Sequence, residues 1–189
     1  MRAVKVVLVG DAKVGKSCIV RRIIDNSFDE FSATTIGVAF QTKIISTEQG
    51  ETVKLQIWDT AGQEQYRSLA KMYFRNANIA LLVFSITMKE SFLSLNEWVP
   101  QILADSTETK FIVIGNKCDL PNSQRAITRE EGMEFSQSIN AITYLETSAK
   151  TGSGIEELIT GISDCDFSQM FTQDVHLTRS KDSYRDRCC

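Results

Sequence analysis

Residues 10–17, Gly-Asp-Ala-Lys-Val-Gly-Lys-Ser, combine two glycines, a lysine and a hydroxyl at a spacing that suits phosphate binding. Gly10 and Gly15 permit backbone conformations in which successive N–H groups point at phosphate oxygens. Lys16 adds positive charge for the outer phosphates, and the Ser17 hydroxyl is suited to magnesium. An apolar stretch precedes this phosphate loop and a helical pattern follows it. The segment therefore predicts a nucleoside triphosphate site, without identifying the base.

A second polar cluster, residues 58–64 (Trp-Asp-Thr-Ala-Gly-Gln-Glu), follows another expected strand. Asp59 can hold magnesium at the strand end, and Gly62 can present a bare N–H to the terminal phosphate. Gln63 can both donate and accept hydrogen bonds, as the orientation of an attacking water requires. We therefore expect catalysis to depend on Gln63 and Gly62, together with Lys16.

Residues 116–119, Asn-Lys-Cys-Asp, follow an apolar strand and predict the base. The Asp119 carboxylate can accept from the paired N1–H and amino group of guanine, whereas adenine presents the wrong pattern. The aliphatic stem of Lys117 can lie along the base, and Asn116 can tie this loop to the phosphate loop. Residues 146–150, Glu-Thr-Ser-Ala-Lys, add backbone N–H groups and a lysine for the carbonyl side of guanine.

Between the first two clusters, residues 27–40 have the polar composition of an exposed loop. Thr35 can supply a second hydroxyl to magnesium and a backbone N–H to the γ-phosphate. An ordinary surface loop is the alternative for this stretch taken alone. Its position in the gap from which a lid can reach the phosphates favours a segment that orders when nucleotide binds.

Short apolar runs that alternate with amphipathic stretches predict the elements that position these clusters. The sum is an open α/β sheet, mostly parallel, with one antiparallel edge pair. Ligands of such sheets bind beyond the carboxyl ends of the strands, where the polar clusters lie. The expected strands are residues 4–9, 39–46, 52–58, 79–86, 111–115 and 142–145.

The composition fits one domain, with 189 residues of which 42% are hydrophobic. A net charge of −3 argues against a general nucleic-acid binder. The five cysteines have neither zinc-site nor disulfide-framework spacing, and charged residues interrupt the apolar start, so we expect a cytoplasmic protein without a signal peptide. We expect a domain at residues 1–164, with a helix from 154 to about 163, and a flexible variable tail at 165–189.

Several segments resemble the Rab family of Ras-like small GTPases over residues 4 to about 160. They are IGVAF (36–40), KLQIWDTAGQE (54–64), YRSL (66–69), MYFRNA (72–77) and the terminal Cys-Cys. The resemblance implies a P-loop GTPase (G) domain, with a six-stranded sheet covered by helices on both faces. It also implies a monomer that binds GTP or GDP with Mg²⁺ and hydrolyses GTP slowly without an activator.

Rab-like function would be a switch in vesicle-mediated membrane traffic, in which the GTP form recruits effectors and hydrolysis releases two loops. Switch I would surround Thr35, and switch II would run from Asp59 to about Arg75. The implied partners are an exchange factor, a GTPase-activating protein, effectors and a dissociation inhibitor.

The resulting site assignment combines the motifs with this resemblance, which places Phe28 near the guanine. The expected magnesium ligands are Ser17, Thr35 and Asp59. The expected nucleotide-binding residues are Ala12, Lys13, Val14, Gly15, Lys16, Ser17, Cys18, Phe28, Thr35, Gly62, Asn116, Lys117, Asp119, Ser148, Ala149 and Lys150.

The tail mixes acidic and basic residues and lacks the polybasic patch that attracts a membrane. In Rab-like chains a terminal cysteine pair is typically geranylgeranylated, and two lipid chains are what stable anchoring takes. The resemblance thus implies prenylation of Cys188 and Cys189. The protein would then cycle between the cytoplasm and the cytosolic face of an intracellular membrane.

Two residues of the phosphate loop differ from the smaller ones usual in the family. A methyl at Ala12 sits where Gln63 and an incoming arginine must meet the γ-phosphate, so slow hydrolysis is an alternative to an active switch. The chain would then be a GTP-loaded module that binds effectors. Lys13 would either stay solvated or add charge near the phosphates. Ala39 stands where an acidic residue is common, which affects the choice of effector.

Overall fold

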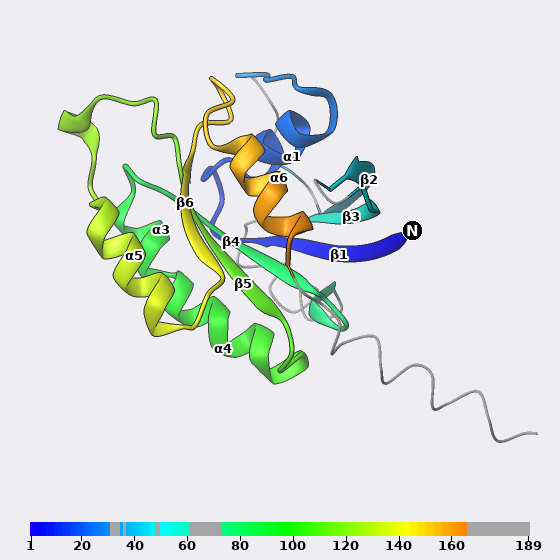
Figure 1. Cartoon of the computed structure of the whole chain (residues 1–189). Coiled ribbons are helices and arrows are strands. Elements are labelled where there is room, and N and C mark those ends of the chain that lie inside the picture. The colour runs from blue at the N-terminus through cyan, green and yellow to red at the C-terminus, as the bar shows by residue number, and fades with distance from the viewer. Residues whose placement is uncertain (31–34, 36, 48–49, 61–72, 166–189) are drawn as a thin grey trace, which may run out of the picture.

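The computed structural model describes residues 1–30, 35, 37–47, 50–60 and 73–165 (Figure 1). Its centre is a six-stranded sheet in the order β2-β3-β1-β4-β5-β6. Neighbouring strands are parallel except for the antiparallel pair β2 and β3. The predicted α/β sheet with one antiparallel edge pair is confirmed. The strands are β1 (Arg2–Val9), β2 (Val38–Ser46), β3 (Thr52–Thr60), β4 (Ile79–Ser85), β5 (Lys110–Asn116) and β6 (Thr143–Thr147).

Helices cover both faces of the sheet, as expected, and divide the core into two layers (Figure 1). One layer lies between the sheet and α1 (Lys16–Asp25) with α6 (Ile155–Ser163). The other lies between the sheet and α3 (Lys89–Leu93), α4 (Leu95–Asp105) and α5 (Arg129–Ser138). A short 3₁₀ helix, η2 (Asn122–Gln124), follows β5.

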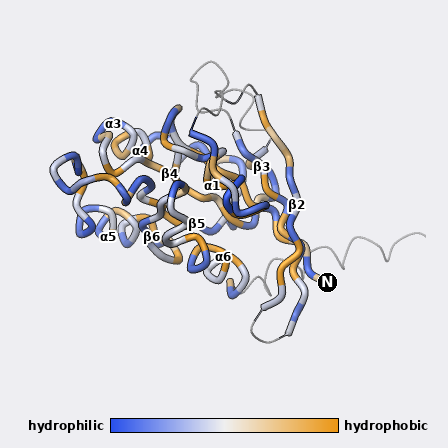
Figure 2. Tube along the Cα trace, turned by 90° about the horizontal axis from the view of Figure 1, so that it is seen from above, coloured by the Kyte–Doolittle hydropathy of each residue, from blue (hydrophilic) through white to orange (hydrophobic). Residues whose placement is uncertain are grey.

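The central strands are apolar throughout because both of their faces are covered. All seven residues of β4 are buried, and β1 sends Val6 into one layer and Val7 into the other. The hydropathy colouring of Figure 2 shows this apolar centre, whereas the edge strand β2 is largely exposed or half-buried. None of the helices in the described ranges combines the length and apolar character needed to span a bilayer.

Strand boundaries differ from the predicted ones by one or two residues, chiefly at the site end of the sheet. The predicted strand at 142–145 is observed at Thr143–Thr147, and β3 and β5 extend to Thr60 and Asn116. Backbone pairing continues into the polar residues there, as in the pair Asn116 and Thr147. The first residues of the polar clusters are therefore held by the sheet itself.

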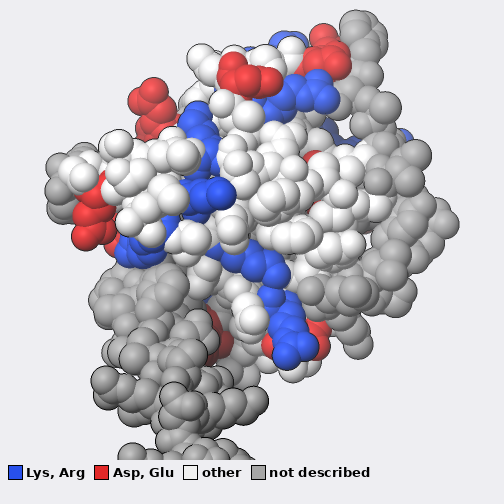
Figure 3. All heavy atoms as spheres, turned by 90° about the vertical axis from the view of Figure 1, so that its right-hand side faces the viewer, with Lys and Arg blue, Asp and Glu red and all other residues white. Residues whose placement is uncertain are grey.

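The first strand begins at the opposite end of the sheet, beside the end of α6. The Arg2 guanidinium donates to the carbonyl oxygens of Ser163 at 2.7 Å and Cys165 at 3.5 Å. Figure 3 views this side of the molecule, where a band of Lys and Arg side chains is flanked by Asp and Glu side chains. Opposite charges are interleaved on this face.

Two helical glycines provide a matched test of the packing. A Cβ on Gly132 of α5 would lie 2.4 Å from the Tyr144 ring, whereas a Cβ on Gly161 of α6 would meet no described residue within 4 Å. We expect Gly132→Ala to lower the free energy of unfolding by about 2 kcal/mol through overpacking. Gly161→Ala should raise it by about 0.5 to 1 kcal/mol through helix propensity. Urea unfolding of both variants measures this, and equal stability of the two would contradict the packing described.

Candidate functional site

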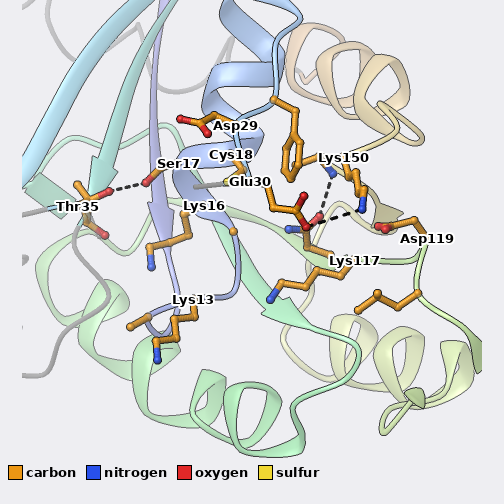
Figure 4. Close-up of a pocket in the computed structure, with 17 residues that line it drawn as sticks. Lys13, Lys16, Ser17, Cys18, Asp29, Glu30, Thr35, Lys117, Asp119 and Lys150 are labelled. Carbon is orange, nitrogen blue, oxygen red and sulfur yellow. Dashed lines mark hydrogen bonds and ion pairs between the residues drawn. The ribbon is translucent and has the colours of Figure 1, made fainter. Parts of the chain in front are cut away.

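A cavity of about 390 Å³ lies at the carboxyl ends of the parallel strands. It brings together the loops that follow β1, α1, β5 and β6 with the last residue of β3, Thr60. Figure 4 shows Lys16, Lys117 and Lys150 arranged around it. The predicted site residues that line the cavity are Ala12, Lys13, Gly15, Lys16, Ser17, Cys18, Phe28, Thr35, Asn116, Lys117, Asp119, Ala149 and Lys150.

Three other predicted residues, Val14, Ser148 and Asp59, are buried and do not line the cavity. Val14 is fully buried in the core layer under α1, and its carbonyl oxygen accepts a hydrogen bond from Asn116. Ser148 is also buried, and its hydroxyl donates to the Asp119 carboxylate at 2.6 Å. Gly62, Gln63, Cys188 and Cys189 lie outside the described residues, so their predicted roles stay predictions.

The phosphate loop has the tight geometry that its glycines suggest. Gly10 and Gly15 have φ angles of 145° and 99°, and a Cβ on Gly15 would lie 2.3 Å from Asn116 Nδ2. Lys13 also has a positive φ, 66°, which is strained for a residue with a side chain. Lys13 therefore adopts the left-handed backbone conformation of the loop although a lysine side chain does not favour that conformation.

Lys16 is buried at the start of α1, directly after Gly15. Its Nζ atom donates to the carbonyl oxygens of Gly10 at 2.7 Å and Asp11 at 2.8 Å. Burial lowers its pKa to about 8, although the nearby carboxylates of Asp59 and Asp11 act in the opposite direction. A buried ammonium held by neutral carbonyls is suited to an incoming anion, which would offset the cost of desolvation.

Three oxygen-bearing side chains meet beside Lys16. The Ser17 and Thr35 hydroxyl oxygens are 2.5 Å apart (Figure 4). Asp59 is buried, and burial raises its pKa, whereas hydrogen bonds from both hydroxyls act in the opposite direction. Its Oδ1 atom has no hydrogen-bond partner among the described residues. The described residues contain no group of three or more His, Cys, Asp or Glu that could hold a metal. One carboxylate with two hydroxyls instead fits Mg²⁺, which also uses water and substrate phosphates as ligands.

The Asn116 side chain connects three loops at the other end of the cavity. Its Nδ2 atom donates to the Val14 carbonyl at 2.8 Å, which is the predicted tie to the phosphate loop. Its Oδ1 atom accepts from the Thr147 hydroxyl at 3.1 Å and the Ala149 N–H at 3.3 Å. Because Asn116 is only 2% exposed, these hydrogen bonds are shielded from water.

Several contacts of the site have no signal in the local sequence. Glu30 faces Lys150 across the cavity mouth, with 3.9 Å between Oε1 and Nζ (Figure 4). The Ser94 hydroxyl, between α3 and α4, donates to the Asp11 carboxylate at 2.7 Å. Arg22 of α1 donates to the carbonyl oxygens of Ala149 and Lys150. Each contact joins residues far apart in the chain, so only the fold reveals it.

A partly buried ion pair supports the last strand just before residues 147–150. Arg125 donates to both carboxylate oxygens of Glu146, at 2.8 and 2.9 Å, and the Tyr144 hydroxyl donates to the same carboxylate at 3.0 Å. The Arg125 hydrogen bonds hold the pKa of Glu146 below its usual value of 4.5.

An aromatic cluster outside the cavity consists of Phe40 on β2, Trp58 on β3 and Tyr73, which precedes β4. The ring of Trp58 is 4.8 Å from that of Phe40 and 5.4 Å from that of Tyr73, measured between centroids. Phe40 is 50% exposed. A half-exposed aromatic surface of this kind is typical of a protein contact site.

Comparisons with known proteins agree with this geometry. A family model described as "Ras family" matches residues 5–165. The chain is 42% identical over 159 residues to "GTP-binding protein ypt5" of Schizosaccharomyces pombe, which covers 84% of this chain and 75% of that relative. It is 44% identical over 155 residues to "Ras-related protein Rab-30" of Homo sapiens, with 82% and 75% covered. "Ras-related protein Rab-4" of Dictyostelium discoideum is 42% identical over 156 residues, with the same coverage.

The ion pair of Arg125 and Glu146 provides a pH-dependent test. We expect Arg125→Met to lower the free energy of unfolding by about 2 kcal/mol at pH 7, because it leaves a half-buried carboxylate unpaired. Since the pKa of Glu146 is lowered in the folded protein, this stabilisation is complete above about pH 4.5 and is lost as the pH falls through the lowered pKa. Urea unfolding at pH 7 and at successively lower pH measures the difference.

The control is Arg21→Met, which removes an exposed ion pair with Asp29 at 3.1 Å. Its effect should stay within about 0.5 kcal/mol. A loss for Arg125→Met that is no larger than this, or that does not change with pH, would contradict the role given to the pair.

Proposed function

The chain belongs to the Ras family as a Rab-like GTPase, and we propose that its cavity binds GTP and GDP to switch effector recruitment in membrane traffic. The observation that supports this function best is the single cavity shared by two kinds of residues. Phosphate-binding candidates such as Lys16 line one part, and base-binding candidates such as Asp119 line another. The volume, about 390 Å³, lies in the range of small-molecule sites.

The base would be selected by hydrogen bonds. Asp119 would accept from the N1–H and amino group of guanine, and its hydrogen bond from Ser148 at 2.6 Å holds the carboxylate in place. Residues 149 and 150 would face the guanine carbonyl. Phe28 and the stem of Lys117 line the cavity and would contact the ring system.

Hydrolysis would follow from positioning and electrostatics more than from covalent chemistry. Gln63 would orient the attacking water, and the Gly62 N–H would donate to the terminal phosphate. Lys16 would turn from the carbonyls of Gly10 and Asp11 toward the outer phosphates. Ser17, Thr35 and Asp59 would hold Mg²⁺, which supplies positive charge against the phosphate oxygens when it is bound.

The switch itself would lie in residues around Thr35 and from Asp59 to about Arg75. In the GTP form Thr35 would also bind the γ-phosphate and Mg²⁺, and loss of the γ-phosphate would remove this contact, so both segments would relax together. The aromatic cluster of Phe40, Trp58 and Tyr73 adjoins these segments and would contact effectors. An exchange factor, a GTPase-activating protein and a dissociation inhibitor complete the proposed partners of this monomer.

Membrane attachment would come from the tail. We assign residues 1–164 to the GTPase domain and residues 165–189 to a variable tail whose Cys188 and Cys189 carry prenyl groups. Two lipid chains provide stable but reversible anchoring. The protein would then move between the cytoplasm and the cytosolic face of an intracellular membrane.

A GTP-loaded module with very slow hydrolysis was the alternative that Ala12 suggested. Ala12 does line the cavity. Family membership supports a hydrolysing switch, however, and no observation favours the slow module over it.

Single-turnover hydrolysis tests the function directly. Protein loaded with GTP and Mg²⁺ should hydrolyse it at a rate on the order of 10⁻⁴ per second without an activator. Gln63→Leu should slow this step at least tenfold while GDP affinity stays unchanged, because the glutamine acts on water and not on binding. Ala12→Gly, run in parallel, reports how far the methyl group slows hydrolysis. GTP that stays bound and uncleaved in the unchanged protein would contradict the proposal.

The base assignment has a separate test in Asp119→Asn. An amide can donate to the 2-carbonyl of xanthine but cannot accept both guanine donors. GDP affinity should therefore fall by roughly 10²-fold or more, and xanthosine diphosphate should become the preferred ligand. Equilibrium titration with both nucleotides measures this. If the variant still prefers GDP, Asp119 does not bind the base and the assignment is wrong.

A further inference from the structure

One arginine outside the predicted site connects two walls of the cavity. Arg22 lies in the last turn of α1 and makes four hydrogen bonds. Its Nε atom donates to the Ala149 carbonyl at 2.9 Å, and one terminal nitrogen donates to the Lys150 carbonyl at 2.8 Å. The other terminal nitrogen donates to the carbonyl and side-chain oxygens of Asn26, at 2.8 and 3.1 Å.

The first two hydrogen bonds fix the orientation of the loop at 149–150. A peptide unit is planar and trans, so its C=O and N–H point in opposite directions. The Ala149 carbonyl shares its peptide plane with the Lys150 N–H. When Arg22 holds that carbonyl, it also sets the direction of the N–H, and both residues line the cavity. The guanidinium thus controls a donor that it does not contact.

The other two hydrogen bonds fix the segment that leads to Phe28. Asn26 ends α1 in the left-handed conformation, with φ of 57°. The chain then turns toward Phe28, which lines the cavity and packs against the core layer under α1. Arg22 therefore holds the residue from which the chain leads to Phe28, as well as the loop at 149–150.

The chemistry of these contacts makes arginine specific. All four acceptors are uncharged oxygens on two separate segments, so the guanidinium acts through direction and not through charge neutralisation. A planar group with several fixed donors can serve both segments, whereas a lysine ammonium is a compact point charge on a flexible stem.

We propose that Arg22 is a positioning residue that holds both walls of the base site and thereby slows the release of guanine nucleotide. This inference rests on the proposed function, because it assumes that guanine occupies the cavity. Arg22 contacts neither the phosphate loop nor the hydroxyls of Ser17 and Thr35 through any of its four hydrogen bonds. Its loss should change nucleotide release and leave hydrolysis nearly intact.

The experiment measures the release of a fluorescent, ribose-labelled GDP from full-length Arg22→Met and Arg22→Lys. We expect both variants to release GDP about tenfold faster than the unchanged protein, since two hydrogen bonds to the loop are lost or misdirected. Hydrolysis of preloaded GTP should change less than about twofold. Arg22→Lys keeps the charge and the helix propensity, so it also serves if Arg22→Met folds poorly.

The matched control is Arg2→Met. The Arg2 guanidinium also donates to two carbonyl oxygens near a helix end, those of Ser163 and Cys165, but at the opposite end of the sheet. Release of GDP from this variant should match that of the unchanged protein even if its stability falls. Equal acceleration by Arg2→Met would mean that general destabilisation causes the effect, and would overturn the inference.

A second ligand separates positioning from a merely structural role. The diphosphate of 2-aminopurine riboside lacks the carbonyl oxygen that the loop at 149–150 would contact. Arg22→Met should accelerate its release less than about threefold, against about tenfold for GDP. Equal acceleration of both ligands would overturn the inference. If the unchanged protein binds no GDP, the proposed function fails and the inference with it; if it binds GDP and the Arg22 variants release it at the unchanged rate, only the inference fails.

Discussion

The candidate site depends on one buried side chain, the amide of Asn116. It joins the phosphate loop, the end of β5 and the loop after β6 through hydrogen bonds to Val14, Thr147 and Ala149. The contact also constrains the phosphate loop, because a Cβ on Gly15 would lie 2.3 Å from the amide nitrogen. A buried amide with three partners allows little rearrangement, since any hydrogen bond left unmade carries the full cost of desolvation. The loops that would hold phosphate and base therefore share one rigid reference point.

The sheet makes this convergence possible. The polar residues Asp59, Asn116 and Thr147 are the last or nearly the last residues of β3, β5 and β6, which run parallel within one sheet. Apolar residues earlier in the same strands form two core layers, so the strand ends cannot shift without disturbing the core. Arg22 and the ion pair of Arg125 and Glu146 add lateral support between loops. The strands that form the core thus also fix the geometry of the site.

Local spacing was enough to predict the sheet, the phosphate loop and most of the cavity wall. Gly10, Gly15 and Lys16 lie within seven consecutive residues, so their spacing is visible in the sequence. The hydrophobic runs likewise indicate strands that are covered on both faces. Arg22, Glu30 and Ser94 could not be predicted, because their partners lie far along the sequence and ordinary residue types mark them. The predicted strand ends differ from the observed ones by one or two residues, because backbone pairing continues into polar residues beyond the apolar run. Val14 and Ser148 are buried and hydrogen-bond to Asn116 and Asp119, so their predicted contacts with the nucleotide stay predictions.

The position of Arg2 bears on how the domain would be oriented if its tail were attached to a membrane. Arg2 is the first residue of β1 and hydrogen-bonds to the end of α6. The cavity lies at the other end of β1, past its last residue. Eight residues of strand span roughly 25 Å, so the two features occupy opposite poles of the domain. A lipid attached through the tail would pull on the pole away from the nucleotide. Regulators could then approach the cavity from the aqueous side while the protein stayed on the membrane, so exchange and hydrolysis would not require detachment.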